Sequence, residues 1–98
     1  MAFEIELSPR AREHVKALRK RDQQIILDAI EVQLRHQPDQ ETRNRKPLEE
    51  NPLAPWEFRV GEFRVFYDLK AAENIVVILA VGRKVHNVLR IGGEEVSL

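Results

Sequence analysis

Two arginines that a short hairpin would hold side by side are the residues of this chain best suited to chemistry. Residues 56–67, WEFRVGEFRVFY, form two alternating runs around Gly61-Glu62, and glycine at the first loop position favours a two-residue type II′ turn. In that register Arg59 lies opposite Arg64, and like charges in a cross-strand pair are destabilising. We therefore expect an anion to neutralise the pair, either a carboxylate of the chain or a bound ligand.

The same register places six apolar residues together on the other face of the hairpin, because side chains of a strand alternate between two faces. They are Trp56, Phe58, Val60, Phe63, Val65 and Tyr67. Trp56 and Tyr67 resemble aromatics that stack on bases, but their cross-strand pairing favours a place in the core.

Other cations lie where the strand order would bring them close to this arginine pair. Arg83-Lys84 follows the apolar run 75–81, and Arg43, Arg45 and Lys46 precede the hairpin. Arginine presents a planar fork that matches phosphate, so a cluster of these residues would bind a nucleic-acid backbone. It would also stabilise the charged transition state of phosphodiester cleavage without a metal. The alternative is a set of surface ion pairs with Glu57, Glu62 and Asp68.

Other catalytic arrangements are missing from the sequence. There is no cysteine and no phosphate-binding glycine-rich loop, and Ser8 is best explained as a helix cap. His14, His36 and His86 match no metal-ligand spacing, so we expect no metal and no cofactor. We expect His14 and His36 to face solvent on helices. His86 is either an exposed loop residue or a general acid/base.

Length and charge restrict the classes of protein that remain. Ninety-eight residues make one domain, and sixteen basic and sixteen acidic residues give a formal net charge of zero. A nucleic-acid interface would therefore be a local patch, because dedicated nucleic-acid binders usually carry a basic excess. No apolar run is long enough to cross a membrane, and the N-terminus does not resemble a secretory signal. We expect a cytoplasmic protein.

The N-terminal part of the chain predicts a strand and two helices. Residues 3–7 alternate like a half-buried strand, and Ser8-Pro9 begins a helix that we expect to end in the cationic run 19–21. Asp22 is the expected cap of a second helix, which Pro38 stops. Its apolar stripe consists of Ile26, Ala29, Ile30 and Leu34.

The rest of the chain predicts a sheet. After a long loop, 38–55, which Leu48 and Leu53 would attach to the core, come the hairpin and a turn at 70–74. The run 75–81 predicts a central strand covered on both faces, ended by Gly82-Arg83-Lys84. Residues 88–98 predict a small hairpin or a bent tail. The fold class is α+β, with an N-terminal strand, a two-helix hairpin on one sheet face and an antiparallel sheet of three or more sequential strands.

The order of these segments resembles the RelE/ParE toxin superfamily. A helix pair, KPL on a loop, W-x-x-R-V-G-x-x-R-V-x-Y and an apolar strand ending in V-G-R-K carry the resemblance, from Ile5 to about Val88. It implies a small antiparallel sheet carrying two helices. RelE-like members are ribosome-dependent mRNA endonucleases that a cognate antitoxin silences, and ParE-like members poison DNA gyrase.

The resemblance also implies roles for individual residues. Arg64 matches the arginine that contacts the scissile phosphate, and Arg83-Lys84 matches a basic pair of which one residue stabilises the transition state. Arg59 and Glu57 fall on strand positions that are lysines in the nucleases, so Glu57 is a charge reversal.

The C-terminal tyrosine that serves as a base in some members has no counterpart in this chain. His86 or Arg90 would have to take its place. We expect Arg64, Arg83, Lys84 and His86 to form the catalytic set. The expected RNA contacts are Arg45, Lys46, Arg59 and Arg90.

The leading hypothesis is therefore a toxin of a type II toxin–antitoxin system that cuts mRNA in the ribosomal A site. Its expected partners are a cognate antitoxin, the ribosome and mRNA. One alternative is a ParE-like gyrase inhibitor, which needs a binding surface but no catalytic residues. The other is a toxin-like module that has lost its activity and serves only in binding.

Overall fold

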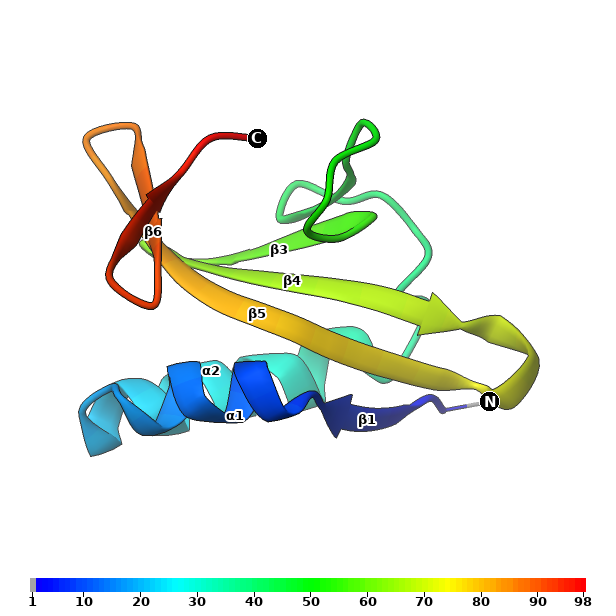
Figure 1. The fold of residues 1–98 in the computed structure, drawn as a ribbon. Helices are drawn as coiled ribbons and strands as arrows, with labels where there is room; N and C mark the ends of the chain where they lie inside the picture. Colours follow the sequence, from blue (N-terminus) through cyan, green and yellow to red (C-terminus); the bar gives the residue numbers. More distant parts are fainter. Residues whose placement is uncertain (1) are drawn as a thin grey trace.

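The long strand β5 (Ile75–Val85) organises the fold, because it is apolar along most of its length and pairs along both edges. The computed structural model describes residues 2–98 and shows a seven-stranded sheet with both helices on one face (Figure 1). The other elements are β1 (Glu4–Leu7), α1 (Pro9–Lys16), α2 (Lys20–Leu34), β2 (Arg45–Pro47), β3 (Trp56–Val60), β4 (Phe63–Lys70), β6 (Val88–Ile91) and β7 (Glu94–Val96). This arrangement confirms the expected α+β fold.

Strands β2 to β7 follow one another across the sheet and pair antiparallel, as the short connections predict. Strand β1 is different, because it pairs parallel with the first half of β5, from Ile75 to Ile78. The second half of β5 pairs with β6 instead. Strands β1 and β6 therefore pair with the same edge of β5, one along its first half and the other along its second half.

Side chains of α1 complete this edge of β5 where neither strand reaches. The Ser8 hydroxyl donates to the Leu79 carbonyl at 3.2 Å, and the Val81 N–H donates to Nδ1 of His14 at 3.1 Å. The expectation that His14 faces solvent is therefore wrong. A backbone N–H that no strand pairs needs another acceptor, and the imidazole supplies it.

The hairpin of β3 and β4 has the register that its sequence predicts. Trp56 pairs with Tyr67, Phe58 with Val65 and Arg59 with Arg64. Gly61 has φ of +58° and Glu62 does not have positive φ, as a type II′ turn requires. The Trp56 and Tyr67 rings stack with centroids 5.9 Å apart, which confirms their place in the core.

The two helices begin and end at different residues from those expected. Ser8 does cap α1, because its hydroxyl accepts from the Ala11 N–H at 3.1 Å. However, α1 ends at Lys16, and the N-cap of α2 is Arg19 rather than Asp22. Asp22 lies in the first turn of α2 and accepts from Arg19 Nε at 3.4 Å. The earlier break allows Leu18 to reach the core.

The sheet has an apolar core on each face. The helix-facing core holds the apolar hairpin residues and the stripe of α2, of which Ala29 is only partly buried. On the opposite face, Phe66 and Ala80 pack with β6 and the long loop. Leu48 and Leu53 pack against this second core, as expected, and β5 is covered on both faces. Figure 1 shows β6 and β7 curling over this side of the sheet.

Two features of the strands differ from the sequence-based expectation. Gly82 does not end β5, which continues to Val85. A Cβ at Gly82 would lie 2.7 Å from the Arg90 carbonyl oxygen, so glycine allows β6 to approach closely. The loop 38–55 contains β2, which pairs with β3 and was not expected. No helix within residues 2–98 is long and apolar enough to cross a membrane.

Candidate functional site

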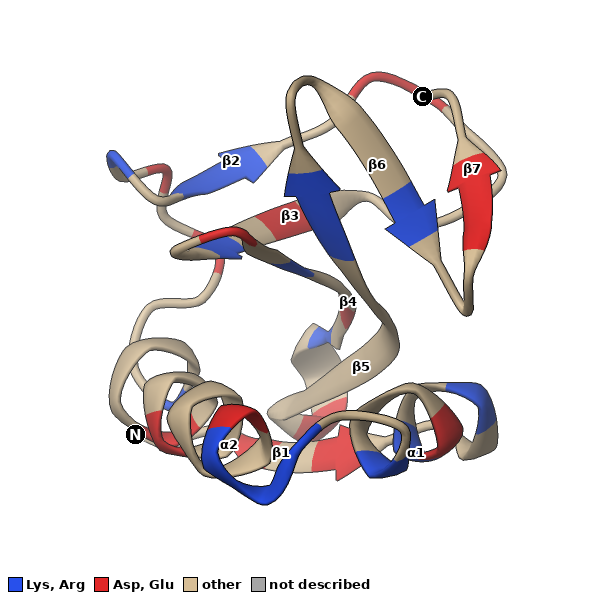
Figure 2. Cartoon of the chain, turned by 90° about the vertical axis from the view of Figure 1, so that its left-hand side faces the viewer, with Lys and Arg blue, Asp and Glu red and all other residues tan. Residues whose placement is uncertain are grey.

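The sheet face that turns away from the helices carries a group of cations. Figure 2 shows basic segments on β2 and at the end of β5, above the part of the sheet that the helices cover. Residues opposite one another in an antiparallel pair share a face. By this register Lys46, Arg59, Arg64 and Lys84 lie on the face of the second core. We call these four residues the cation face.

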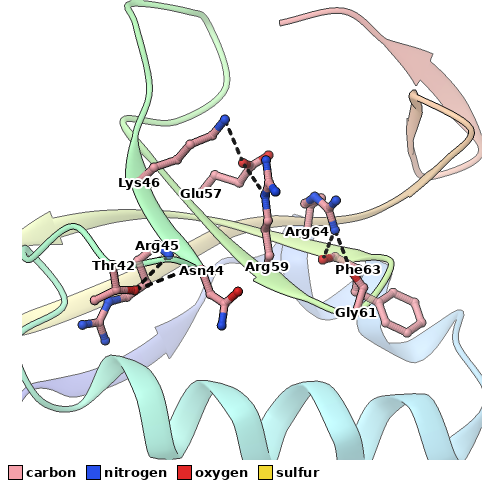
Figure 3. Close-up of polar contacts among 9 residues, drawn as sticks. All are labelled: Thr42, Asn44, Arg45, Lys46, Glu57, Arg59, Gly61, Phe63 and Arg64. Atoms are coloured by element: carbon pink, nitrogen blue, oxygen red, sulfur yellow. Dashed lines mark hydrogen bonds and ion pairs between the residues drawn. The ribbon is translucent and has the colours of Figure 1, made fainter.

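Glu57 is the carboxylate that neutralises part of this cation face. Its Oε2 lies 3.7 Å from Nζ of Lys46 and 3.9 Å from Nε of Arg59 (Figure 3). The Glu57 side chain is only 8% exposed, whereas those of Lys46 and Arg59 are about half exposed. The expected ion pairing by acids of the chain is thus present here. Asp68 is not part of it, because its carboxylate accepts from the Leu69 N–H.

Arg64 is the cation of this face that has a buried donor without a partner among the described residues. Its Nη1 donates to the carbonyls of Gly61 at 2.8 Å and Phe63 at 3.0 Å, both in its own hairpin (Figure 3). Its Nε is buried and has no hydrogen-bond partner among the described residues. Burial lowers the pKa of the Arg64 guanidinium, Arg59 lowers it further, and Glu57 acts in the opposite direction. An anion bound beside Arg64 would therefore stabilise its charged form.

Lys84 lies on the cation face near the end of β5, on the strand next to that of Arg64. It pairs with Leu89 of the second core, and it lines a cavity of about 550 Å³ together with Lys46 and Glu57. Residues of the long loop and of the C-terminal segment form the rest of the wall, Glu49 and Glu50 among them. The cavity is therefore lined by charged residues of both signs, two lysines and three glutamates.

Arg83 lies on the opposite face of the sheet from Arg64. It pairs with Phe63, and its guanidinium lies over the Phe63 ring at 5.1 Å from the centroid. Its Nε donates to Oε2 of Glu62 at 3.1 Å. The structure therefore brings Lys84 to Arg64 and separates Arg83 from both, since consecutive residues of a strand face opposite ways.

Two further candidates lie with Arg83 rather than with Arg64. Arg90 pairs with Arg83 across β5 and β6, and Glu95 of β7 lies on its other side. His86 is exposed in the turn between these strands with φ of +52°. Both line a second cavity of about 660 Å³, which also includes His14. Their expected roles in RNA contact and proton transfer would need RNA to reach this other face.

Arg45 has a structural role, because its side chain lies between β2 and the end of α2. It is 7% exposed, and its guanidinium donates to the carbonyls of Gln33 and of Gln40, the latter at 3.2 Å. These bonds join β2 to the end of α2 and to the loop after it. Its neighbour Lys46 faces the other way and reaches the cation face.

The cation face can hold phosphate groups, but it offers little for proton transfer. None of the three histidines lines its cavity, and no tyrosine does. Within residues 2–98 there is no group of His, Cys, Asp or Glu that could hold a metal ion. Arg83 and Lys84 are adjacent in the sequence and are expected to act as a pair. Strict alternation along β5 would have separated them, had the strand been expected to continue past Gly82.

Comparisons with known proteins agree with this fold. The toxin–antitoxin complex RelBE2 of Mycobacterium tuberculosis contains a similar chain, with a TM-score of 0.74 and 23% identity over 86% of this chain and all of that one. The archaeal RelE–RelB complex of Pyrococcus horikoshii contains another, with a TM-score of 0.66 and 18% identity over 83% and 93% of the two chains. No curated protein matches the sequence.

The sequence itself assigns the family. Residues 5–88 match the model of the family described as ParE toxin of type II toxin-antitoxin system, parDE. This range includes most of β1, both helices and the strands β2 to β5. The chain therefore belongs to the ParE toxin family of type II toxin–antitoxin systems, within the RelE/ParE superfamily.

Proposed function

We propose that this toxin cleaves mRNA on the ribosome, in the cytoplasm, and that its cation face binds the RNA backbone. The observation that supports this proposal best is the state of Arg64. Its guanidinium is partly buried, lies opposite Arg59 and leaves Nε without a partner among the described residues. A phosphate would supply both the missing charge and hydrogen-bond acceptors in a planar arrangement that suits arginine.

The cleavage step that fits these residues is attack by an RNA 2′-hydroxyl on the neighbouring phosphorus. The 2′-oxygen loses its proton to water as it attacks, the 5′ oxygen of the next nucleotide leaves and takes up a proton from water, and a cyclic phosphate remains on the first nucleotide. Arg64 would hold the phosphate, and Lys84 from the adjacent strand would stabilise the charge that develops on it. Because the cavity contains no histidine or tyrosine, orientation of the RNA by the ribosome would supply much of the acceleration.

A second candidate function is inhibition of DNA gyrase. The observation that favours it is Glu57, which neutralises Lys46 and Arg59 at the centre of the cation face. A toxin that acts by binding alone needs neither a free phosphate site nor a proton acceptor. The family match does not separate these two functions, since it assigns only a ParE toxin.

We also propose a cognate antitoxin as the partner that silences the toxin. Both similar structures are complexes of a toxin with an antitoxin. A short reading frame next to the gene, encoding a DNA-binding antitoxin, would support this partner. Co-expression of the two proteins should then restore growth of cells that the toxin arrests.

Induction of the toxin in cells, followed by mapping of mRNA 5′ ends, tests the leading proposal. New 5′ ends within translated regions, and arrested growth, are expected for the wild-type chain. Arg64→Ala should abolish both while the protein remains folded, because a partly exposed arginine contributes little to stability. The control is Arg12→Ala, an exposed arginine on α1, which should remain toxic.

Two outcomes would contradict mRNA cleavage and distinguish the alternatives, and a third would remove the role assigned to Arg64. Unchanged mRNA with a DNA-damage response and inhibited supercoiling would assign gyrase as the target. Unchanged mRNA with normal growth would leave a binding module without toxic activity. A large loss of thermal stability in Arg64→Ala would show that this arginine has a structural role in the hairpin.

A further inference from the structure

Glu57 is unusual because it is a buried acid at the centre of a basic surface. Its residue exposure is 6%, and it lies across the sheet from Lys46 and two positions before Arg59 on β3. A carboxylate in such a place is stable only when it is paired. Its pairs are Lys46 at 3.7 Å and Arg59 at 3.9 Å, and its charge also reaches Arg64.

A phosphate approaching this face would meet cations that already have a partner. The Glu57 carboxylate lies within ion-pair distance of Lys46 and Arg59 and offsets part of their charge (Figure 3). Arg64 and Lys84 are different, since neither forms an ion pair with a carboxylate among those described. Two of the four cations are therefore partly neutralised before any ligand binds.

We propose that Glu57 is an internal counter-ion that limits how strongly the cation face binds RNA. In this role it acts through Lys46 and Arg59, so it is a positioning residue and does not touch the RNA. It holds these two side chains in place in the free protein and leaves Arg64 and Lys84 as the main phosphate contacts. This inference rests on the proposed RNA site and specifies what sets its affinity.

The predicted consequence appears in the dependence of binding on salt. For single-stranded nucleic acid, each phosphate that a protein neutralises adds roughly 0.7 to the slope of log K against log salt concentration. Glu57→Gln keeps the size of the side chain but removes its charge. If this frees Lys46 and Arg59, the slope should become steeper by about 0.7 to 1.4. Affinity at low salt should rise at least tenfold.

The experiment measures binding of a fluorescent twelve-nucleotide single-stranded RNA to the full chain over a series of salt concentrations. Glu57→Asp should restore wild-type behaviour, because it keeps the charge. The matched control is Glu62→Gln, which removes an acid that pairs with Arg83 on the opposite face of the sheet. It should leave both slope and affinity unchanged.

A second pair of variants keeps the test decisive if Glu57→Gln does not fold. Lys46 and Lys84 are both surface lysines of the cation face, but only Lys46 is paired with Glu57. Lys84→Ala should therefore weaken RNA binding at least fivefold more than Lys46→Ala does. Equal losses from the two variants would show that Glu57 does not neutralise Lys46 and would overturn the inference.

Failure of this inference differs from failure of the proposed function. If Glu57→Gln has the same slope and affinity as the wild type while the toxin cuts mRNA in cells, Glu57 does not limit binding. If the slope steepens as expected and mRNA in cells stays intact, the counter-ion role stands and the cleavage proposal fails. If the slope also becomes steeper in Glu62→Gln, the change in net charge alone explains the effect. That result would overturn the inference.

Discussion

His14 shows at the scale of one residue how a helix side chain can serve as part of a sheet. Its Nδ1 accepts from the Val81 N–H, so the imidazole is neutral with its proton on Nε2. Burial lowers the pKa of His14 below its usual range, and the charge of Arg10 lowers it further. Both effects favour the form that can accept this bond.

The stability of the protein should therefore fall on acidification through this residue. Since the pKa of His14 is lower in the folded state, its contribution is complete above the unfolded value of about 6.5. It is lost as the pH falls from there toward the folded pKa, because the unfolded chain takes up the proton first. The melting temperature measured between pH 7.5 and 5.5 should show this loss.

His14→Asn offers a specific check on this pH dependence, because the amide oxygen can accept the Val81 N–H without titrating. The variant should keep most of the stability at pH 7.5 and lose less of it on acidification. The control is His36→Asn, since His36 is exposed beyond the end of α2. An equal decline in the wild type and in His14→Asn would show that other groups cause the acid sensitivity.

The position of a site residue could be predicted from the sequence where only the alternation of side chains along a strand decides it. The pairing of Arg59 with Arg64 follows from the hairpin sequence and is confirmed. The positions of Arg83 and Lys84 on opposite faces were not foreseen, because the strand was expected to end before them. The acceptor role of His14 had no signal in the sequence, since it depends on a gap between β1 and β6.

At the scale of elements, the close approach of β5 and β6 depends on Gly82. A Cβ there would lie 2.7 Å from the Arg90 carbonyl oxygen and 2.8 Å from Cγ1 of Ile91. The carbonyl belongs to the backbone of β6, so it cannot move without moving the strand. Gly82 also pairs with Arg64 on β4 and is two residues from Lys84, so a shift of β5 at this point would move Lys84 relative to Arg64.

Gly82→Ala should therefore destabilise the protein by about 1–3 kcal/mol, the usual cost of overpacking in a core. Urea denaturation followed by circular dichroism would measure it, and RNA binding should weaken as Lys84 shifts. The control is Val85→Ala at the exposed end of β5, which should cost at most about 1 kcal/mol. A Gly82→Ala variant as stable as wild type would mean that β6 is free to move away.

Element types were easier to predict than element boundaries. Hydrophobic periodicity identified both helices, the hairpin and the central strand, because each buries a regular apolar stripe. The break between α1 and α2 was misplaced, since the cationic run 19–21 suits the end of one helix as well as the start of the next. Strand β2 is only three residues long and contains Pro47, so its local signal is weak.

At the scale of the whole molecule, the local grouping of charges tells more about binding than the net charge does. The formal net charge is zero, yet the cation face gathers four basic side chains around one buried acid. Further acids lie on β1 and β7 (Figure 2), whereas Glu49 and Glu50 of the long loop line the cavity beside Lys46 and Lys84. A partner that must cover the cation face therefore gains from being acidic, even though the toxin as a whole is neutral.

We expect the cognate antitoxin to use this charge separation. It should present a short acidic segment that folds on binding and places a carboxylate or simple bulk near Arg64 and Lys84. A partner at one hundred times its Kd adds about 2.7 kcal/mol to the free energy of unfolding of the toxin. For a domain of this size the melting temperature should rise by roughly 10 °C or more.

Thermal melts of the complex at several salt concentrations would test how the partner binds. If the acidic segment lies on the cation face, the gain in melting temperature should shrink as salt screens the contact. Charge reversal with Arg64→Glu should reduce the gain further, whereas Arg12→Glu on α1 should leave it almost unchanged. A gain that responds to neither salt nor Arg64→Glu would place the partner on another surface, and silencing of the toxin would then occur without direct cover of the cation face.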